Sequence, residues 1–356
     1  MTIVSNDAFI SVIIITYNSE NYIYDCIMSI QDQTYLNYEV IVLDNASTDS
    51  TMEVIVTNFP WVKIINSNEN LGFAGGVNLA YECSKGEYIA LLNPDAKADN
   101  DWLRNLSHTM DKERTCGICA SLILQWGTEI IDTAGDGCTR AGKGFKIGNN
   151  ELAKRYSETK EVFAACGGAA LYRRSMIEEI GFFDEDFFLL HEDSDLSFRA
   201  RLAGWKCIYV PNAVVEHKVS ASIGYKTSIA VYHAVKNTDM VWLKNLPITL
   251  MLITLPEKAL SDLALFIYVG IVHGKIKEYF KAKWYILSNL LKILEKRRYI
   301  QGKRKITQRN ILNKLTPFIS MQYLILHWRG KRKELNIRFK GSFAGESKRI
   351  NNNSDS

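Results

Sequence analysis

Residues 9–31 read FISVIIITYNSENYIYDCIMSIQ, and this stretch sets the fold class of the chain. Its opening, Phe9–Thr16, is a β-branched apolar run typical of a buried strand. Between Ser19 and Gln31 the apolar residues recur at helical spacing. Such a strand–helix unit, if repeated, predicts an α/β fold with a mostly parallel central sheet and helices on both faces. It does repeat, with strands predicted at Tyr38–Leu43, Trp61–Asn66 and Tyr88–Leu92 and helices at Thr48–Asn58 and Ala74–Ser84.

The pattern between residues 100 and 210 is less regular. We predict an exposed, mobile loop at Gly135–Asn150, because five glycines fall within it. A Gly-Gly bend interrupts the strands predicted within Val162–Tyr172. The other predicted elements are a helix at Asn100–Lys112, a strand at Gly117–Leu124, a helix at Ser194–Ala203 and a strand at Trp205–Val210.

The length of 356 residues allows one large domain or two of medium size. The first residues, MTIVSNDAF, lack the basic start and apolar run of a secretion signal. Seven scattered cysteines without an export signal are typical of reduced thiols, so we expect a cytoplasmic location. Cys116 and Cys119 form a CxxC pair, but no second pair completes a zinc site. We interpret both as small buried residues.

The net charge of +4 hides a strong asymmetry. Residues 270–340 hold 19 lysines and arginines against 3 glutamates, which leaves the rest of the chain at −12. Segment 275–298, KIKEYFKAKWYILSNLLKILEKRR, is typical of a helix lying at a membrane surface. The alternatives are a basic helix packed on its own domain and a nucleic-acid contact. The apolar stretches Asn245–Pro256 and Leu263–Gly274 are each too short to cross a bilayer.

Residues 181–199, GFFDEDFFLLHEDSDLSFR, set six carboxylates among phenylalanines and leucines. Apolar neighbours draw this segment toward the interior, where a carboxylate is costly unless it is paired, hydrogen-bonded or bound to a metal. We therefore interpret it as part of a functional site, with a solvated acidic loop as the alternative. Asp195 and Arg199 stand four residues apart, in the order that favours an ion pair on a helix.

Polar residues follow the predicted strands, where ligands of parallel sheets bind. Thr16 and Asn18 follow the first strand. Asp44 follows the second, and its carboxylate can accept a hydrogen bond from the imide of a pyrimidine base. Residues 68–78, NENLGFAGGVN, let backbone approach a ligand, and the next helix is expected to present free N–H groups to an anion. The GxGxxG spacing is absent, which argues against a dehydrogenase.

The turn Asn93-Pro94-Asp95 closes the fourth predicted strand. A single carboxylate there can hold Mg²⁺ or Mn²⁺, with phosphates and water completing the shell. His217, after another predicted strand, is a candidate further ligand.

The motifs ITYN, DNASTD, NENLGFAGGVN, LLNPDA, GGAALYRR, GFFDEDFF, HEDSDLSFR and VEH follow one another along the chain. Together they resemble the inverting family 2 glycosyltransferases of the GT-A fold, whose sheet is Rossmann-like, and among them the rhamnosyltransferase-like branch. The resemblance covers about residues 8–245. It implies a GT-A domain at 1–245, with a nucleotide-sugar half at about 8–115 and an acceptor half at about 116–245. A helical, basic, membrane- or acceptor-associated extension at 246–340 and a disordered tail at 341–356 complete the expected organisation.

The resemblance also implies roles for single residues. Asp193 matches the catalytic base, and Asp95 with His217 match ligands of a divalent Mg²⁺ or Mn²⁺ ion. The family's Asp-x-Asp metal motif is altered here, because Asn93 replaces its first carboxylate. The residues implied in nucleotide-sugar binding are Thr16, Asn18, Asp44, Asn45, Asn70, Gly72, Phe73, Gly76, Asn78 and Asn93. Those implied in acceptor binding or support are Gly168, His191, Glu192, Asp195 and Arg199.

The activity implied is transfer of one sugar with inversion, with dTDP-rhamnose as the expected donor and a UDP-sugar as the alternative. The expected acceptor is a glycan or a polyprenyl-diphosphate-linked sugar in cell-surface polysaccharide (O-antigen) synthesis, met by a peripheral enzyme at the inner face of the cell membrane. A nucleotidyltransferase is disfavoured, because ITYN stands where a basic glycine-rich signature is expected. A non-catalytic glycan-binding protein is disfavoured because Asp95, Asp193 and His217 are all present. We expect no nucleic-acid partner and leave a homodimer open.

Overall fold

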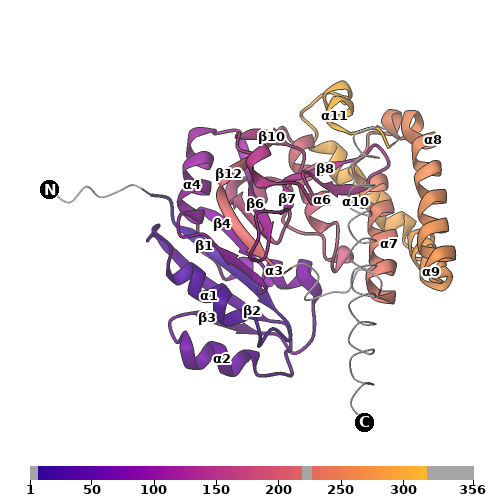
Figure 1. Ribbon diagram of the computed structural model, residues 1–356. Coiled ribbons are helices and arrows are strands. Elements are labelled where there is room, and N and C mark those ends of the chain that lie inside the picture. Colours follow the sequence, from indigo (N-terminus) through magenta and orange to yellow (C-terminus); the bar gives the residue numbers. More distant parts are fainter. Residues whose placement is uncertain (1–6, 219–226, 319–356) are drawn as a thin grey trace, which may run out of the picture.

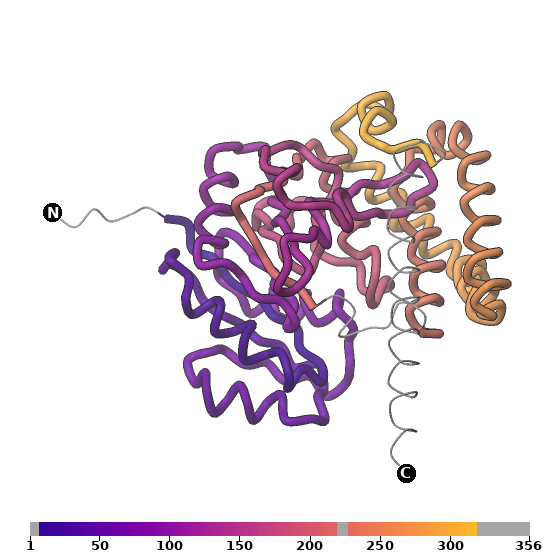
Figure 2. The backbone as a smooth tube through the Cα atoms, in the orientation of Figure 1, coloured from indigo at the N-terminus to yellow at the C-terminus, as the bar shows by residue number. Residues whose placement is uncertain are grey.

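The computed structural model describes residues 7–218 and 227–318. Its centre is a ten-stranded sheet in the order β10-β12-β6-β11-β4-β1-β2-β3, with β5 paired to β12 and β7 paired to β6 (Figure 1). Strands β8 and β9 form a separate two-stranded sheet. The backbone trace runs from the N-terminal strands on one side of the molecule to the C-terminal helices on the other (Figure 2).

The elements have the following bounds. The strands are β1 (Ile10–Thr16), β2 (Tyr38–Asp44), β3 (Lys63–Asn66), β4 (Tyr88–Leu92), β5 (Ala96–Ala98), β6 (Cys116–Gln125), β7 (Ile131–Ala134), β8 (Asp136–Cys138), β9 (Gly144–Lys146), β10 (Lys160–Val162), β11 (Ala169–Arg173) and β12 (Lys206–His217). The helices are α1 (Ile23–Gln31), α2 (Thr51–Asn58), α3 (Gly72–Glu82), α4 (Trp102–Lys112), α5 (Arg174–Ile180), α6 (Glu192–Leu202), α7 (Ser228–Asn245), α8 (Ile248–Leu265), α9 (Ile276–Ser288), α10 (Leu290–Gly302) and α11 (Gln308–Lys314). Short 3-10 helices lie at η1 (Ala153–Arg155) and η2 (Glu185–Phe187), and a π-helix, η3 (Phe266–Val272), continues α8.

The strands predicted from the opening repeats pair in parallel, in the order β4-β1-β2-β3. The register between β1 and β2 sets Thr16 opposite Asp44, so both strands end in polar residues at one edge of the sheet. Strand β11 lies between β4 and β6 and pairs antiparallel with both. Strands β6 and β12 pair in parallel with each other. The predicted α/β fold is confirmed, with antiparallel pairing confined to its second half and its edges.

Helices cover both faces of the sheet because alternate residues of each strand point to opposite sides. Ile10, Val12 and Ile14 of β1 belong to a core that includes residues of α1, α2 and α4. Ile13 and Ile15 of the same strand belong to a second core with residues of α3, α5 and α6. The repeated strand–helix pattern therefore predicts the layering correctly.

The prediction of an exposed, mobile loop at Gly135–Asn150 is wrong. The segment is mostly buried or half-buried and contains β8 and β9. A Cβ on Gly144 would lie 2.6 Å from the Ser194 hydroxyl oxygen, and one on Gly137 would lie 2.2 Å from the Phe145 ring. Glycine is needed there because backbone runs directly against side chains, and composition alone does not separate this use from an open loop.

The C-terminal helices pack on the body of the molecule through a shared core. Phe163 and Phe198 of the body cluster with Met240 of α7, Ile286 of α9 and Ile300 of α10. The helix predicted over 275–298 is two helices, since α9 ends and α10 begins on either side of residue 289. Within 7–218 and 227–318, no helix has the length and apolar character to span a bilayer. The predicted tail at 341–356 and the outer extension at 319–340 lie outside the described residues.

Candidate active site

The ends of β1 and β2 form the first part of the site. The backbone N–H of Asn45 donates to the Thr16 carbonyl at 2.8 Å, which ties the two strand ends together. Asn18, with a positive φ of 49°, accepts a 2.8 Å hydrogen bond from a backbone N–H of the turn after β2. Asp44 is buried beside them. The buried Thr16 hydroxyl has no hydrogen-bond partner among the described residues, as is expected where a ligand supplies one.

Asn45 joins these strand ends to helix α3. Its Nδ2 donates to the Gly72 carbonyl at 2.9 Å, and its Oδ1 accepts from the Leu71 N–H at 3.1 Å. Asn70 accepts from the Gly72 N–H at 2.9 Å. Gly72 has a φ of +71°, and a Cβ there would lie 2.5 Å from the Phe188 carbonyl oxygen. Only glycine combines this backbone conformation with such a close approach.

The expectation that α3 presents free N–H groups to an anion is wrong. The Phe188 carbonyl accepts hydrogen bonds from the N–H groups of Phe73 and Ala74, at 2.8 and 3.2 Å. The Gly72 N–H is taken by Asn70. The first donors of the helix are thus satisfied within the chain. The acidic segment folds back over this helix terminus, which no local spacing reveals.

Three residues implied in nucleotide binding pack against other parts of the chain, and two of them join the two halves of the molecule. A Cβ on Gly76 would lie 3.0 Å from the Ile15 side chain, so α3 lies directly on β1. The Asn78 side chain donates to the Phe183 carbonyl at 2.9 Å and accepts from the Phe183 N–H at 3.1 Å. Phe73 stacks edge-on against the Phe183 ring. Their contacts to a nucleotide remain predictions.

The structure brings the two implied metal ligands together. His217 Nε2 lies 3.3 Å from Asp95 Oδ1, because the pairing of β12 with β5 sets His217 opposite Ala96. On its other side, His217 Nδ1 lies 3.2 Å from Asp132 Oδ2, and Lys146 Nζ lies 2.6 Å from Asp132 Oδ1. Burial lowers the pKa of His217, but the hydrogen bonds to Asp132 and Asp95 outweigh it and raise this pKa to about 9.

The residues present fit a divalent ion at Asp95 and His217. A carboxylate oxygen and an imidazole nitrogen suit Mn²⁺, and Mg²⁺ prefers the oxygen. Asp132 behind the ring is the usual support of a metal-bound histidine, since it fixes the tautomer and the orientation. Sequence reasoning missed Asp132 and Lys146. Asp132 lies 85 positions before His217, and only the pairing of β7, β6 and β12 joins them.

The Gly167–Gly168 bend places the candidate base beside this acid–histidine pair. The Gly167 N–H donates to Asp193 Oδ2 at 3.1 Å. The Gly168 carbonyl accepts from the Asn93 N–H at 2.8 Å, and a Cβ on Gly168 would lie 3.0 Å from the Asn93 amide nitrogen. Asp95 follows Asn93 by two residues. The two acidic positions therefore flank one bend.

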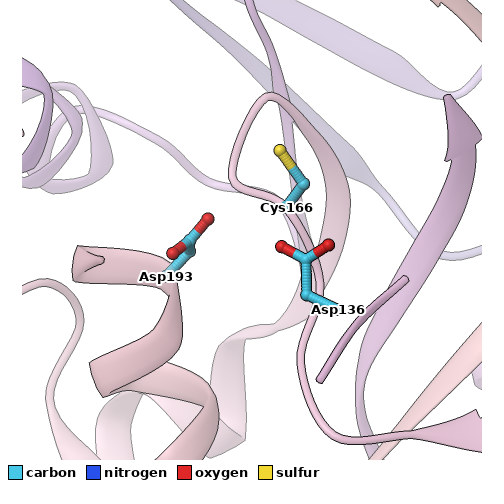
Figure 3. A group of neighbouring side chains, drawn as sticks. All are labelled: Asp136, Cys166 and Asp193. Atoms are coloured by element: carbon cyan, nitrogen blue, oxygen red, sulfur yellow. The ribbon is translucent and has the colours of Figure 1, made fainter. Parts of the chain in front are cut away.

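Asp193, at the start of α6, faces Asp136 of β8 and Cys166 of the bend (Figure 3). One ligand atom from each of the three residues lies within 4.8 Å of the others. Burial raises the pKa of the Cys166 thiol well above its ordinary value. Burial, and then the charge of Asp193, raise the pKa of Asp136 to about 7. Because the thiolate and not the thiol binds metal, we interpret this cluster as an acid–base group.

The segment leading into α6 is held in a costly conformation. Phe188, Leu190 and His191 have φ values of 64°, 66° and 67°. The buried Asn237 of α7 donates to three carbonyls within residues 187–190, at 2.6–3.0 Å. Bulky residues at positive φ persist where the surroundings fix them, commonly at functional sites. Asn237 is a further residue that sequence reasoning missed, since it lies far along the chain in an ordinary helical pattern.

Two other acidic residues of segment 181–199 are buried, and each is either paired with a cation or protonated near pH 7. The alternative of a solvated acidic loop is therefore not supported. Asp195 is fully buried and pairs with Arg199 at 2.8 Å, as predicted, and with Lys244 at 3.0 Å. Burial, and then the charge of Asp193, raise the pKa of Glu192 to about 8. Burial lowers the pKa of His191, so its ring is neutral near pH 7.

Solved structures define the class of the fold. The TM-score is 0.54 with GalNAc-T7 bound to UDP, GalNAc and Mn²⁺, at 19% identity over 66% of this chain and 49% of that one. It is 0.52 with the mannosyltransferase PcManGT from Pyrobaculum calidifontis, bound to GDP-Man and Mn²⁺, at 18% identity over 84% and 85%. The fold is therefore of the GT-A glycosyltransferase type.

Sequence comparisons agree with this fold. The model of glycosyl transferase family 2 matches residues 11–181 of the chain. An uncharacterized glycosyltransferase of Haemophilus influenzae is 34% identical over 134 residues, 33% of this chain and 42% of its own length. An N-acetylglucosaminyl-diphospho-decaprenol L-rhamnosyltransferase of Mycobacterium tuberculosis is 26% identical over 236 residues, 60% of this chain and 77% of its own length. The Escherichia coli UDP-Glc:alpha-D-GlcNAc-diphosphoundecaprenol beta-1,3-glucosyltransferase WfaP is 36% identical over 106 residues, 30% of this chain and 42% of its own length.

Proposed function

We propose that this protein transfers one sugar, with inversion, from a nucleotide donor to a polyprenyl-diphosphate-linked acceptor in cell-surface polysaccharide synthesis. The observation that carries the proposal is that one Gly167–Gly168 bend bonds both Asp193 and the backbone of Asn93, two residues before the Asp95 that pairs with His217. The names of two relatives support a lipid-linked acceptor, and they differ in the donor sugar, rhamnose in one and glucose in the other. The first donor to test is dTDP-rhamnose and the second is a UDP-sugar.

The chemistry needs a base on one side of the anomeric carbon and positive charge on the other. The acceptor hydroxyl oxygen bonds to the anomeric carbon while the bond from that carbon to the diphosphate breaks, and the nucleoside diphosphate leaves with the electron pair. Asp193 takes the hydroxyl proton. Asp95 and His217 are the residues that would hold a divalent ion, which when bound supplies positive charge to the leaving diphosphate.

The nucleotide is proposed to lie at the ends of β1 and β2. Asp44 accepts a hydrogen bond from the nucleobase, and the unpartnered Thr16 hydroxyl is available to the nucleotide. Asn18 is held in a left-handed conformation toward the same edge. Asn45 and Asn70 act indirectly, because their amides are used to fix the start of α3.

We also propose that the protein binds an anionic membrane through α8, η3, α9 and α10. Exposed apolar side chains gather on these helices, among them Leu291, Trp284 and Leu252, at 84%, 70% and 67% exposure. Exposed cations such as Lys277 and Arg298 lie on the same helices. Apolar insertion with flanking cations is the usual basis of interfacial binding.

Part of the basic charge is used within the protein itself. Lys292 and Lys296 of α10 each lie 2.7 Å from Asp186, and Lys305 lies 2.7 Å from Glu179. For Lys292 and Lys296 these contacts favour the alternative of a basic helix packed on its own domain. The proposed membrane contact therefore depends more on apolar side chains than the charge count of the sequence indicates.

Donor screening followed by a transfer assay tests the activity. A thermal-shift screen of dTDP-rhamnose, UDP-glucose and GDP-mannose with Mn²⁺ should show one donor raising the melting temperature, because a ligand of the folded state stabilises it. That donor with GlcNAc-diphospho-undecaprenol should then yield a disaccharide lipid of inverted anomeric configuration. Asp193→Asn should abolish transfer and spare donor binding, while Asp101→Asn, an exposed acid beside α4, should change neither. Transfer by the Asp193 variant at the wild-type rate would rule out this base.

Vesicle sedimentation tests the membrane contact. The double variant Trp284→Ser with Leu291→Ser should bind phosphatidylglycerol vesicles at least about tenfold more weakly than the wild type, since burying such side chains contributes about 1.5–3 kcal/mol each. Leu36→Ser is the matched control, because Leu36 is 85% exposed but lies between α1 and β2. Equal loss of binding in both variants, or none in either, contradicts the proposed surface.

A further inference from the structure

Asp136 is a buried carboxyl group to which the proposed reaction assigns no task. Two backbone hydrogen bonds with Ala164, of 2.8 and 2.9 Å, fix its position, and its Oδ1 accepts from the Thr133 hydroxyl at 2.6 Å. Its carboxyl group faces Asp193 (Figure 3), with ligand atoms of the two within 4.8 Å. Two carboxylates at this separation in a partly buried site ionise together only at a cost, so one of them keeps a proton to higher pH.

The surroundings offset the charge of this pair only in part. The charge of Lys146 of β9 lowers the pKa of Asp136, but burial and the charge of Asp193 outweigh it, and Lys146 Nζ also lies 2.6 Å from Asp132 Oδ1. Three groups next to the pair, Glu192, Cys166 and His191, are neutral near pH 7. Burial raises the pKa of Glu192 to about 8, raises the pKa of the Cys166 thiol well above its ordinary value, and lowers the pKa of His191. The charged or titratable groups that interact with the pair include Asp132, Lys146, Cys166, Tyr172, His191, Glu192 and Cys207, with Lys143 near His191.

We propose that Asp136 is a positioning residue that acts through Asp193: the two carboxyl groups hold one proton between them, and Asp193 becomes a stronger base when that proton leaves. This inference rests on the proposed function, since it gives Asp193 the task of base. Asp136 itself touches neither donor nor acceptor in the scheme.

The proton balance is simple. In the active form both carboxyl groups are ionised, and the acceptor hydroxyl proton passes to Asp193 as the oxygen bonds to the anomeric carbon. The neighbouring charge of Asp136 then favours the protonated Asp193, because protonation relieves the repulsion. In the inactive form the pair already holds a proton. The burial and charge that raise the pKa of Asp136 to about 7 place the change between these forms near neutral pH.

The pH profile of transfer tests the role. With GlcNAc-diphospho-undecaprenol and the donor found by screening, the wild-type kcat/KM for acceptor should rise with a midpoint near pH 7. In Asp136→Asn this midpoint should no longer lie near pH 7, because the carboxyl group that titrates there is gone. The rate at pH 8 should fall about tenfold to 100-fold, because a weaker base catalyses less well. The KM for donor should not change, and Asp101→Asn should keep the wild-type profile. An unchanged midpoint in Asp136→Asn overturns the proposal while leaving the proposed function intact.

A measurement without substrate tests the shared proton. A carboxyl whose folded pKa exceeds its unfolded value stabilises the fold at low pH and loses this contribution as pH rises through the folded pKa. The melting temperature of Asp136→Asn, and of Asp136→Ser as a second variant, should therefore rise relative to the wild type between pH 5 and pH 8. A difference that stays constant with pH overturns the shared proton. If this difference appears but the wild type transfers no sugar, the proposed function and the role of Asp136 within it fail together, and the proton-sharing pair stands.

Discussion

Lys244→Met tests how much the acidic segment depends on one buried cation. Lys244 is 1% exposed and lies between Asp184 and Asp195, with its Nζ 3.0 Å from Asp195 Oδ1. Methionine keeps much of the volume and removes the charge, and breaking a buried pair costs about 3–5 kcal/mol. For 356 residues unfolding as one unit, the entropy of unfolding is about 0.75 kcal/mol per degree. The melting temperature should therefore fall by about 4–7 °C, as measured by calorimetry.

The control and the pH dependence make this prediction specific. Lys292→Met removes a 52% exposed lysine paired with Asp186 and should cost about 1 °C or less. Burial raises the pKa of Asp184, but the charges of Lys244 and Lys296 outweigh it and hold that pKa well below its usual range. This stabilisation is present above about pH 4 and is lost as pH falls further. The gap between Lys244→Met and the wild type should be constant from pH 5 to 8 and shrink toward pH 3. A fall below 1 °C at pH 7, or a gap that widens in acid, refutes the reasoning.

Three further predictions concern the site. Asp132→Asn removes the carboxylate behind His217 and should weaken Mn²⁺ binding about 10–100-fold in calorimetry, and an unchanged affinity contradicts the supporting role. Gly72→Ala places a Cβ 2.5 Å from the Phe188 carbonyl oxygen and should lower the melting temperature and donor affinity together. Gly127→Ala, also at positive φ but with no atom within 4 Å, should cost only the backbone term of about 1–2 kcal/mol and spare donor binding. Excess EDTA should abolish transfer, and full activity in EDTA would remove the metal from the mechanism.

The first half of the fold follows from local sequence signals, because each parallel strand and its helix are neighbours along the chain. The polar residues at strand ends were predictable for the same reason, since the sheet aligns those ends. Thr16 and Asp44 illustrate this, as adjacent strands in parallel register set them opposite each other. Helix boundaries were less accurate, and α1 begins at Ile23 instead of Ser19.

The residues that complete the site could not be predicted from spacing. Asp132, Asp136 and Lys146 lie in the second half, where antiparallel pairing brings distant segments together. Asn237 reaches the acidic segment only because α7 packs against it. Their residue types are ordinary for turns and helices, so composition gave no signal. The glycines around them gave a misleading one, since the same residue permits both exposure and close contact.

The carbonyl of Phe188 caps helix α3, so the segment that leads to the proposed base also completes the helix beside the proposed nucleotide site. This dependence limits protein engineering. A chimera that borrows residues 181–191 from a relative to change the glycan it elongates inherits a foreign cap for α3. We therefore expect such a graft to keep its fold only when α3 is taken from the same relative. Residues 181–191 and α3 should be exchanged together.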